Sequence, residues 1–269
     1  MDTPTDYEGA VNKITRFLSG MLDRTPAQGY VVGISGGIDS ALAATLAVKA
    51  VGPQAVFGLM MPYRTSSRES LVHGRQLIEG LGIDWRQIDI SPMIDAYYSA
   101  IDDSNRLRAG NKMARERMAI LFDVAQELGY LVLGTGNRTE ICLGYTTWYG
   151  DSACSLNPIG QLYKGEVRQL ARQLGILESI ITKPPSADLW QNQTDEGEIG
   201  VTYEQIDGIL RRLIDDGERS LKQLERDGFA AVDVSRVVSL FNRNAFKRRM
   251  PEIAPLGKAD FPNEIALAE

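Results

Sequence analysis

The sequence contains very little histidine and cysteine. Among its 269 residues are one histidine, His73, and two cysteines, Cys142 and Cys154. A single histidine rules out a histidine-rich metal centre and disfavours a Ser-His-Asp triad, so His73 is expected at the surface or at a helix cap. The cysteines form no C-x-x-C pair, which favours two reduced structural thiols over a zinc site or a redox dithiol.

Long apolar runs and an excess of positive charge are also missing. No stretch approaches the roughly 20 apolar residues that span a bilayer. Residues 1–4 do not begin a basic segment followed by an apolar run. We therefore expect no association with a membrane and expect a cytoplasmic location. The net charge of −6 and the pI near 5.1 argue against a nucleic-acid-binding surface, although they allow a local basic pocket.

Short apolar runs alternate with helical patterns through the first half of the chain. Strands are expected at 30–34, 55–60, 85–90 (the weakest) and 130–134. Helices are expected at 8–22, 38–50, 66–81, from about 92, and 110–128. This alternation predicts an α/β fold, a Rossmann-like parallel sheet with helices on both faces. Such sheets bind ligands beyond the carboxyl ends of their strands, where the loops after Ile34 and Leu133 are expected.

The second half of the chain has a different pattern. Residues 182–200 show no periodicity and predict a functional loop, whereas 203–214, 218–228 and 231–246 predict helices. We therefore expect a single domain over 1–269 whose C-terminal part, about 200–250, is helical.

A glycine-rich loop joins the first expected strand to the following helix. Its two adjacent glycines allow a tight turn that brings backbone N–H groups close to phosphate oxygens, and the helix begins at the same place. Ser35 and Ser40 add hydroxyl groups, while Asp39 would repel a phosphate unless Mg²⁺ lay between them. The alternative is a glycine turn in which Asp39 and Ser40 only cap the helix. The residues expected to bind phosphate are Gly33, Ile34, Ser35, Gly36, Gly37, Ile38, Asp39 and Ser40.

The run Ser-Gly-Gly-x-Asp-Ser resembles the pyrophosphate loop of the N-type ATP pyrophosphatase superfamily. It has neither the lysine of a Walker loop nor the G-x-G-x-x-G spacing of a dinucleotide fold. The resemblance implies cleavage of ATP to AMP and pyrophosphate, with transfer of the adenylate to a substrate.

Later segments resemble the ammonia-dependent NAD synthetases, in the same order along the chain from about residue 8 to about 250. These segments are 134–140, 144–151, 157–160, 162–164, 184–189 and 193–196. The resemblance implies that Asp39 and Glu140 bind Mg²⁺. It also implies that Thr135, Lys164 and Ser186 contact ATP, and that Arg115, Asp151 and Lys247 contact deamido-NAD.

Two of these residues are assigned chemical roles. Lys164 is expected to stabilise the negative charge that grows at the pentavalent phosphorus, and Asp151 to hold ammonium and accept a proton. Structural alternatives remain open for four residues. Glu140 would be a helix-turn acid, Lys164 a surface residue at a helix start, Arg115 part of a solvated helix edge and Asp151 a turn residue.

Three positions depart from the bacterial relatives. Trp148 and Ser155 stand where many of them have Lys and Asp, and Phe246 stands where some have His. These changes leave the ATP chemistry intact but bear on the identity of the substrate. Trp148 would stack on a pyridine or adenine ring, or else serve only in packing.

The resemblance implies amidation of deamido-NAD by ammonia through an adenylate. Free ammonia is the expected nitrogen source, because the chain has no room for a glutaminase domain. A homodimer is the expected assembly. The alternatives are another ATP pyrophosphatase, such as a different amide ligase or a tRNA-thiolating enzyme, and a non-catalytic ATP-binding sensor. Thiolation is disfavoured by the missing cysteine pair and the acidic composition.

Overall fold

A parallel sheet forms the centre of the molecule. The computed structural model describes residues 6–101, 105–186 and 193–254. Its four strands lie in the order β3-β2-β1-β4, and every pairing is parallel, which confirms the predicted sheet. The strands are β1 Tyr30–Gly33, β2 Val56–Met60, β3 Asp84–Gln87 and β4 Leu131–Leu133.

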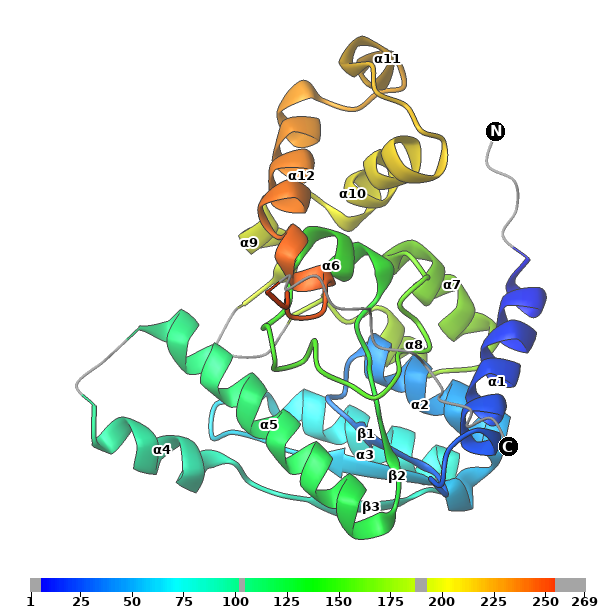
Figure 1. Cartoon of the computed structure of the whole chain (residues 1–269), viewed down its shortest axis with the longest axis vertical. Helices are drawn as coiled ribbons and strands as arrows, with labels where there is room; N and C mark the ends of the chain where they lie inside the picture. The colour runs from blue at the N-terminus through cyan, green and yellow to red at the C-terminus, as the bar shows by residue number, and fades with distance from the viewer. Residues whose placement is uncertain (1–5, 102–104, 187–192, 255–269) are drawn as a thin grey trace, which may run out of the picture.

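Helices alternate with these strands and continue after them (Figure 1). The helices of the first half are α1 Tyr7–Asp23, α2 Ile38–Val51, α3 Arg68–Leu81, α4 Ser91–Ser99 and α5 Arg106–Leu128. Those of the second half are α6 Arg138–Leu143, α7 Lys164–Gln173, α8 Glu178–Ile181, α9 Asp195–Ile199, α10 Tyr203–Leu210, α11 Leu221–Arg226 and α12 Ala231–Arg243. The first-half helices match the prediction, except that α5 begins before residue 110.

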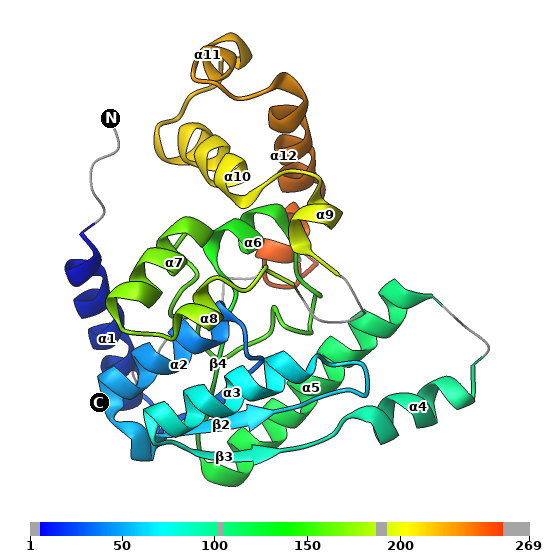
Figure 2. The same ribbon diagram turned by 180° about the vertical axis from the view of Figure 1, so that it is seen from behind.

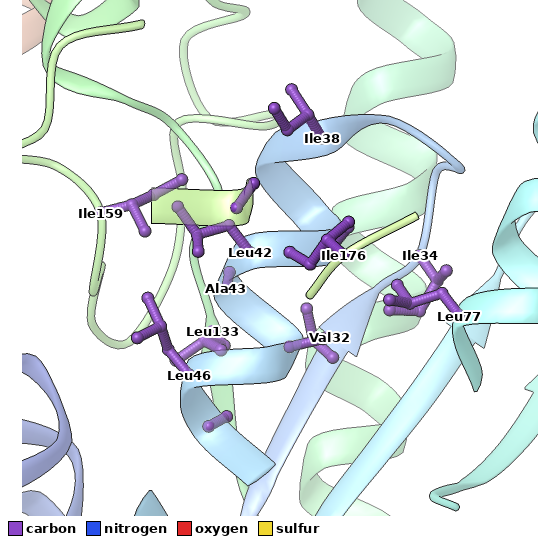
Figure 3. Packing of buried hydrophobic residues seen from close by; sticks show 14 of the residues in the cluster. Val32, Ile34, Ile38, Leu42, Ala43, Leu46, Leu77, Leu133, Ile159 and Ile176 are labelled. Carbon is purple, nitrogen blue, oxygen red and sulfur yellow. The ribbon is translucent and has the colours of Figure 1, made fainter. Parts of the chain in front are cut away.

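The sheet has a hydrophobic core on each face. Successive side chains of a strand point to opposite faces, so Val32 packs among α1, α2, α3, α7 and α8, whereas Val31 packs among α4 and α5. Figure 3 shows Leu46 of α2 beside Leu133 of β4, and Leu42 of the same helix beside Ile159. Leu42 and Leu46 are fully buried. This burial on both faces explains why β1 is an apolar run.

The direction of the connections changes at β1. From β1 the chain adds β2 and then β3 on one side, and β4 later pairs on the other side. The loops after β1 and β4 therefore diverge, one toward α2 and the other toward α6, and a crevice forms between them at the carboxyl ends of the strands. These are the two loops that the sequence placed there.

The helices after residue 200 have a core of their own, built around α10, α11 and α12. They lie at one end of the molecule, beyond α6, in both views (Figures 1 and 2). The expected helix at 203–214 is α10 followed by one π-helical segment, Arg211–Asp215, and that at 231–246 is α12 followed by the 3₁₀ segment Ala245–Arg248. The single-domain boundary over 1–269 stays a prediction.

Two expectations from the sequence are wrong. The third strand ends at Gln87 rather than at 90 and is exposed, because it is the edge of the sheet and α5 and α3 pack mainly on the inner strands. His73 is buried rather than at the surface, because it lies on the face of α3 that also carries the buried residues Leu77 and Ile78.

The short helices α6 to α9 were not expected from periodicity. Each has at most ten residues, too few to repeat an apolar stripe several times. One of them, α9, lies inside the segment 182–200, whose residues 187–192 fall outside the described ranges. No helix among the described residues is long and apolar enough to cross a membrane.

The core predicts the effect of a truncation in α2. Replacing fully buried Leu46 by alanine should lower the free energy of unfolding by about 2–5 kcal/mol, since the side chain leaves a cavity against the sheet. Urea unfolding would measure the loss. Leu177→Ala is the matched control, because Leu177 is 46% exposed, and its effect should stay within about 0.5 kcal/mol. Equal losses in the two variants would contradict the packing described here.

Candidate active site

A cavity of about 740 Å³ opens at the carboxyl ends of β1 and β4. Its walls come from the loop after β1, the loop after β4, α5, the segment before α9, and α12. It therefore spans the crevice between the sheet and the C-terminal helices. A cavity of this size accommodates a nucleotide-sized ligand.

The loop after β1 has the shape of a phosphate site. Gly36 has φ +77°, and a Cβ there would lie 2.1 Å from the carbonyl oxygen of Ser70, so only glycine fits. Gly37 is the N-cap of α2 and has no side-chain cap. The start of α2 thus has no side-chain cap and lines the cavity through Gly37, Ile38 and Asp39, so an anion bound there would be stabilised.

The two hydroxyls of this loop bond mainly within the loop. Ser35 Oγ lies 3.0 Å from Ser40 Oγ and accepts from the N–H of Gly37 at 3.2 Å. Ser40 Oγ accepts from the Ser35 N–H at 3.3 Å and donates to the Gly37 carbonyl at 3.0 Å. They therefore hold the turn in shape. Asp39 does not act only as a cap, because its carboxylate takes part in the ion-pair cluster described next.

Lys164 is the central cation of the cavity. Its side chain is 2% exposed, and Nζ lies 2.5 Å from Asp39 Oδ2 and 3.2 Å from Glu140 Oε1. Asn137 Nδ2 donates to the other oxygen of Asp39 at 2.9 Å. Asp39 and Glu140 thus converge on one positive charge, as their placement after β1 and β4 predicted. The alternative of a surface Lys164 is wrong, because α7 starts beneath the loops rather than outside them.

Hydrogen bonds to the backbone position Lys164. Asp207 of α10 accepts from the Gly165 N–H at 2.7 Å and from the Thr139 hydroxyl at 2.5 Å. The same hydroxyl accepts from the Lys164 N–H at 3.0 Å. Burial raises the pKa of the Asp207 carboxyl, and these donors oppose the rise. The start of α7 is therefore fixed to both α6 and α10.

Glu140 has two functions in the structure. It completes a capping box with Asn137, whose N–H donates to Glu140 Oε2 at 3.2 Å, while Oε1 faces Lys164. Burial raises the pKa of Glu140 to about 8; the Lys164 ammonium opposes this rise, and the Asp39 and Asp195 carboxylates add to it. Burial alone would lower the pKa of Lys164, but the two paired carboxylates raise it and the net direction is upward.

The carboxylates of Asp39 and Glu140 fit a magnesium site. They converge on one cationic group and both line the cavity. Within the described ranges, no three His, Cys, Asp or Glu side chains form a metal site by themselves. Mg²⁺ typically binds one or two carboxylates together with water and substrate phosphates, so this pair suits a metal that arrives with a nucleotide.

Asp195 is a buried acid near Lys164 to which the sequence assigned no role. Asp195 is 5% exposed and accepts from Tyr203 Oη at 3.0 Å and Tyr145 Oη at 3.2 Å. Burial raises the pKa of Asp195, and Lys164 opposes that rise. The Lys164 ammonium also lies 5.1 Å from the centre of the Tyr203 ring. Asp195 falls in the 193–196 segment that carried the family resemblance, which was the available signal.

Two of the three residues expected near deamido-NAD, Asp151 and Lys247, also line the cavity. Asp151 accepts from the Thr146 hydroxyl at 2.6 Å and from the Thr147 N–H at 2.8 Å. Lys247 donates to the carbonyls of Thr146 and Gly144 at 2.7 and 2.8 Å. Burial lowers the pKa of Lys247, and the Asp151 carboxylate opposes this shift. Asp151 is therefore a turn residue and also a cavity residue.

Arg115 is not brought into this group. It is exposed on α5, outside the residues that line the cavity, and its Nε donates to the Trp148 carbonyl at 3.2 Å. Asn111, one turn earlier, does line the cavity and accepts from the Thr147 hydroxyl at 2.8 Å. The geometry of this chain thus matches the solvated-edge alternative, and a substrate contact by Arg115 stays a prediction.

The three departures from the bacterial pattern lie beside the cavity rather than in its lining. Trp148 packs against Tyr149 and Phe246, with ring centres 4.5 and 5.1 Å away. Ser155 accepts from the Val132 N–H at 3.1 Å, which ties it to the sheet edge. Packing is thus the role that the described contacts support for Trp148. The remaining predicted ATP contacts, Thr135 and Ser186, do line the cavity, whereas residues 187–189 lie outside the described residues.

The fold and the cavity together define a nucleotide-binding α/β protein of the adenine nucleotide α-hydrolase-like class. A family model described as NAD synthase matches residues 10–251. The chain therefore belongs to the NAD synthase family, as the sequence motifs indicated.

Individual relatives agree with this assignment. An NH₃-dependent NAD⁺ synthetase from Trichlorobacter lovleyi is 48% identical over 88% of this chain and 87% of its own length. The NH₃-dependent NAD synthetase from Campylobacter jejuni, solved with nitrate, has a TM-score of 0.80 and 33% identity, covering 93% of this chain and 100% of its own. An NMN synthetase from Francisella tularensis has a TM-score of 0.83 and 35% identity, covering 93% of this chain and 99% of its own.

The ion-pair cluster predicts a pH-dependent loss of stability. Replacing Lys164 by methionine leaves two facing carboxylates without a cation, which should cost about 3–5 kcal/mol of unfolding free energy. The pKa of Glu140, already raised in the folded state, should rise further. A group with a raised folded-state pKa loses stabilisation as pH increases, so the deficit should be larger near pH 9 than near pH 5. Urea unfolding at the two pH values measures it.

Two controls accompany this test. Adding Glu140→Gln to the Lys164→Met variant should recover part of the loss, because one of the facing charges is removed. Lys222→Met removes an exposed lysine of α11 and should change stability by no more than about 0.5 kcal/mol. A deficit that is the same at both pH values would refute the electrostatic origin.

Proposed function

We propose that the chain catalyses the ATP-dependent amidation of deamido-NAD by ammonia, giving NAD, AMP and pyrophosphate. The observation that carries this proposal is the joining of two sites in one cavity. The phosphate loop with the Asp39–Lys164–Glu140 cluster and the pair Asp151 and Lys247 line the same cavity. Membership of the NAD synthase family supports the same reaction.

The first step is adenylation of the substrate carboxylate. One carboxylate oxygen attacks the α-phosphorus of ATP, the bond from that phosphorus to the bridging oxygen breaks, and its electron pair leaves with pyrophosphate. The N–H groups at the start of α2 hold phosphate oxygens, and Lys164 neutralises negative charge at the phosphorus. Mg²⁺ held by Asp39 and Glu140 would screen the charge of the phosphates.

The second step is attack of ammonia on the activated carbonyl carbon. Adenylation is required because a free carboxylate is a poor electrophile and hydroxide is a poor leaving group. Asp151 holds ammonium and accepts its proton, so that neutral ammonia adds to the carbonyl carbon. AMP then leaves with the electrons of the broken C–O bond, and the added nitrogen releases a second proton to solvent. The bonds from Thr146 and Thr147 fix the Asp151 carboxylate at the cavity wall.

A homodimer, a cytoplasmic location and free ammonia as the nitrogen source belong to this proposal. The acidic composition supports the expectation that nucleic acid is not a partner. Analytical ultracentrifugation tests the assembly: a single species of twice the chain mass agrees with it, and a monomer at all concentrations contradicts it.

A second candidate substrate follows from one structural relative. The Francisella tularensis protein is named for NMN rather than for NAD, and the acid that corresponds to NMN is nicotinate mononucleotide. The aromatic packing of Trp148 and Phe246 in place of charged residues bears on the same choice. Both acids share the group that reacts, so they differ only in how the rest of the molecule is bound.

The reaction itself can be tested directly. The protein with ATP, Mg²⁺, ammonium and deamido-NAD should form AMP, pyrophosphate and NAD in equal amounts. ATP–pyrophosphate exchange with deamido-NAD or nicotinate mononucleotide as the acid should favour deamido-NAD. Formation of ADP would contradict adenylation, and exchange supported only by the mononucleotide would assign the second substrate. Tight ATP binding without any ATP–pyrophosphate exchange would instead favour a non-catalytic ATP-binding sensor.

The role of Asp151 gives a separate prediction. Asp151→Asn should retain ATP–pyrophosphate exchange within about tenfold, while NAD formation falls about 10²- to 10⁴-fold, because only the ammonia step needs the proton acceptor. Rapid-quench measurements should show the adenylate accumulating. Thr146→Val, which removes one donor to Asp151, is the control and should reduce both activities only slightly. An equal loss of exchange and of amidation in Asp151→Asn would overturn this role.

A further inference from the structure

Lys183 is a second lysine beside the phosphate loop, and the family resemblance implies no role for it. It follows α8 and lines the cavity together with Ser35 and Gly37. Its Nζ donates to Ser70 Oγ at 2.6 Å, and the two residues are 113 positions apart. The side chain is half-buried. Its position therefore results from the tertiary fold rather than from a local turn.

Ser70 connects Lys183 to the tightest point of the loop. It is 4% exposed and lies in the first turn of α3, where its N–H donates to Ser67 Oγ at 3.0 Å. Its carbonyl oxygen is the atom that a Cβ on Gly36 would meet at 2.1 Å. The lysine ammonium is thus held by a residue whose backbone packs directly on the phosphate loop.

Lys183 differs from Lys164 in its charge environment. The ammonium of Lys164 faces the carboxyl groups of Asp39 and Glu140, so its charge is already compensated by protein. For Lys183, the part of the chain that the structure describes contains no carboxylate within ion-pairing distance, and its recorded contact is a neutral hydroxyl. A triphosphate bound at the loop would therefore find the charge of Lys183 uncompensated by protein.

We propose that Lys183 binds the terminal phosphates of ATP and, after adenylation, the pyrophosphate that leaves. This assignment rests on the proposed function, because it requires ATP to place its phosphates on the loop after β1. When the bond between the α-phosphorus and the bridging oxygen breaks, its electron pair moves to the pyrophosphate. A cation beside that leaving group stabilises the added charge.

The alternative role for Lys183 is structural. Through Ser70, the lysine would only fix the segment after α8 against α3, without touching a ligand. A structural lysine would affect every nucleotide that occupies the cavity, whereas a ligand to the terminal phosphates affects only ligands that possess them. Comparing ATP with AMP therefore separates the two roles.

The test uses isothermal titration calorimetry of the full chain with ATP, AMP and pyrophosphate, each in the presence of Mg²⁺. Lys183→Gln should weaken ATP and pyrophosphate binding about ten- to one-hundredfold, the effect of losing one charged hydrogen bond, and leave AMP binding within about twofold. Lys183→Arg should restore most of the ATP affinity. Lys222→Gln, at an exposed position on α11, is the matched control and should change none of the affinities.

Each outcome decides the assignment. Equal weakening of ATP and AMP, or unchanged ATP binding in Lys183→Gln, would overturn it. If Lys183→Gln proves unfolded in thermal melts, Lys183→Arg and Ser70→Ala replace it. Ser70→Ala should then weaken ATP more than AMP, and equal effects would overturn the proposal. In a separate outcome, the unmodified protein forms no NAD while Lys183→Gln still weakens the binding of ATP but not of AMP. That result would uphold the role of Lys183 in phosphate binding and refute only the amidation reaction.

Discussion

The ammonium of Lys164 between the carboxylates of Asp39 and Glu140 is the interaction on which the site depends. A buried charge is tolerated only when it is paired and hydrogen-bonded, and Lys164 is 2% exposed with two partners. Asp39 follows β1 and Glu140 follows β4, so this one cation joins the two loops at the point where the strand order reverses. The bonds from Thr139 and Asp207 fix the backbone from which it extends.

This cluster also explains how one cavity serves two chemical steps. Its acids exceed its cation, and Asp195 adds a further buried carboxylate beside it. Carboxylate oxygens are ligands that suit a metal arriving with a triphosphate, as the proposed function requires. Under the proposed function, the start of α2 binds the phosphates and the turn around Asp151 holds the group that accepts the proton from ammonium. The C-terminal helices close the space between them.

Much of this arrangement could be predicted from the sequence, because apolar periodicity indicated the inner strands and the long helices, and the glycine-rich loop indicated where a phosphate would bind. The family resemblance implied that Asp39 and Glu140 share a cation, and their positions after two strands of a parallel sheet agreed with it. The burial of Lys164 did not follow, since α7 is placed by contacts with α6 and α10 rather than by its own pattern. Asp195 and the exposed position of Arg115 depend in the same way on tertiary packing.

The central claim is that Asp39 and Glu140 form one cation site that the nucleotide completes. The most direct test is electron paramagnetic resonance of Mn²⁺, which shares the oxygen-ligand preference of Mg²⁺, in the presence of a non-hydrolysable ATP analogue. The account predicts that the unmodified protein binds the metal with the analogue and that Asp39→Asn and Glu140→Gln each weaken this binding about tenfold or more. Undiminished binding in either variant would contradict it.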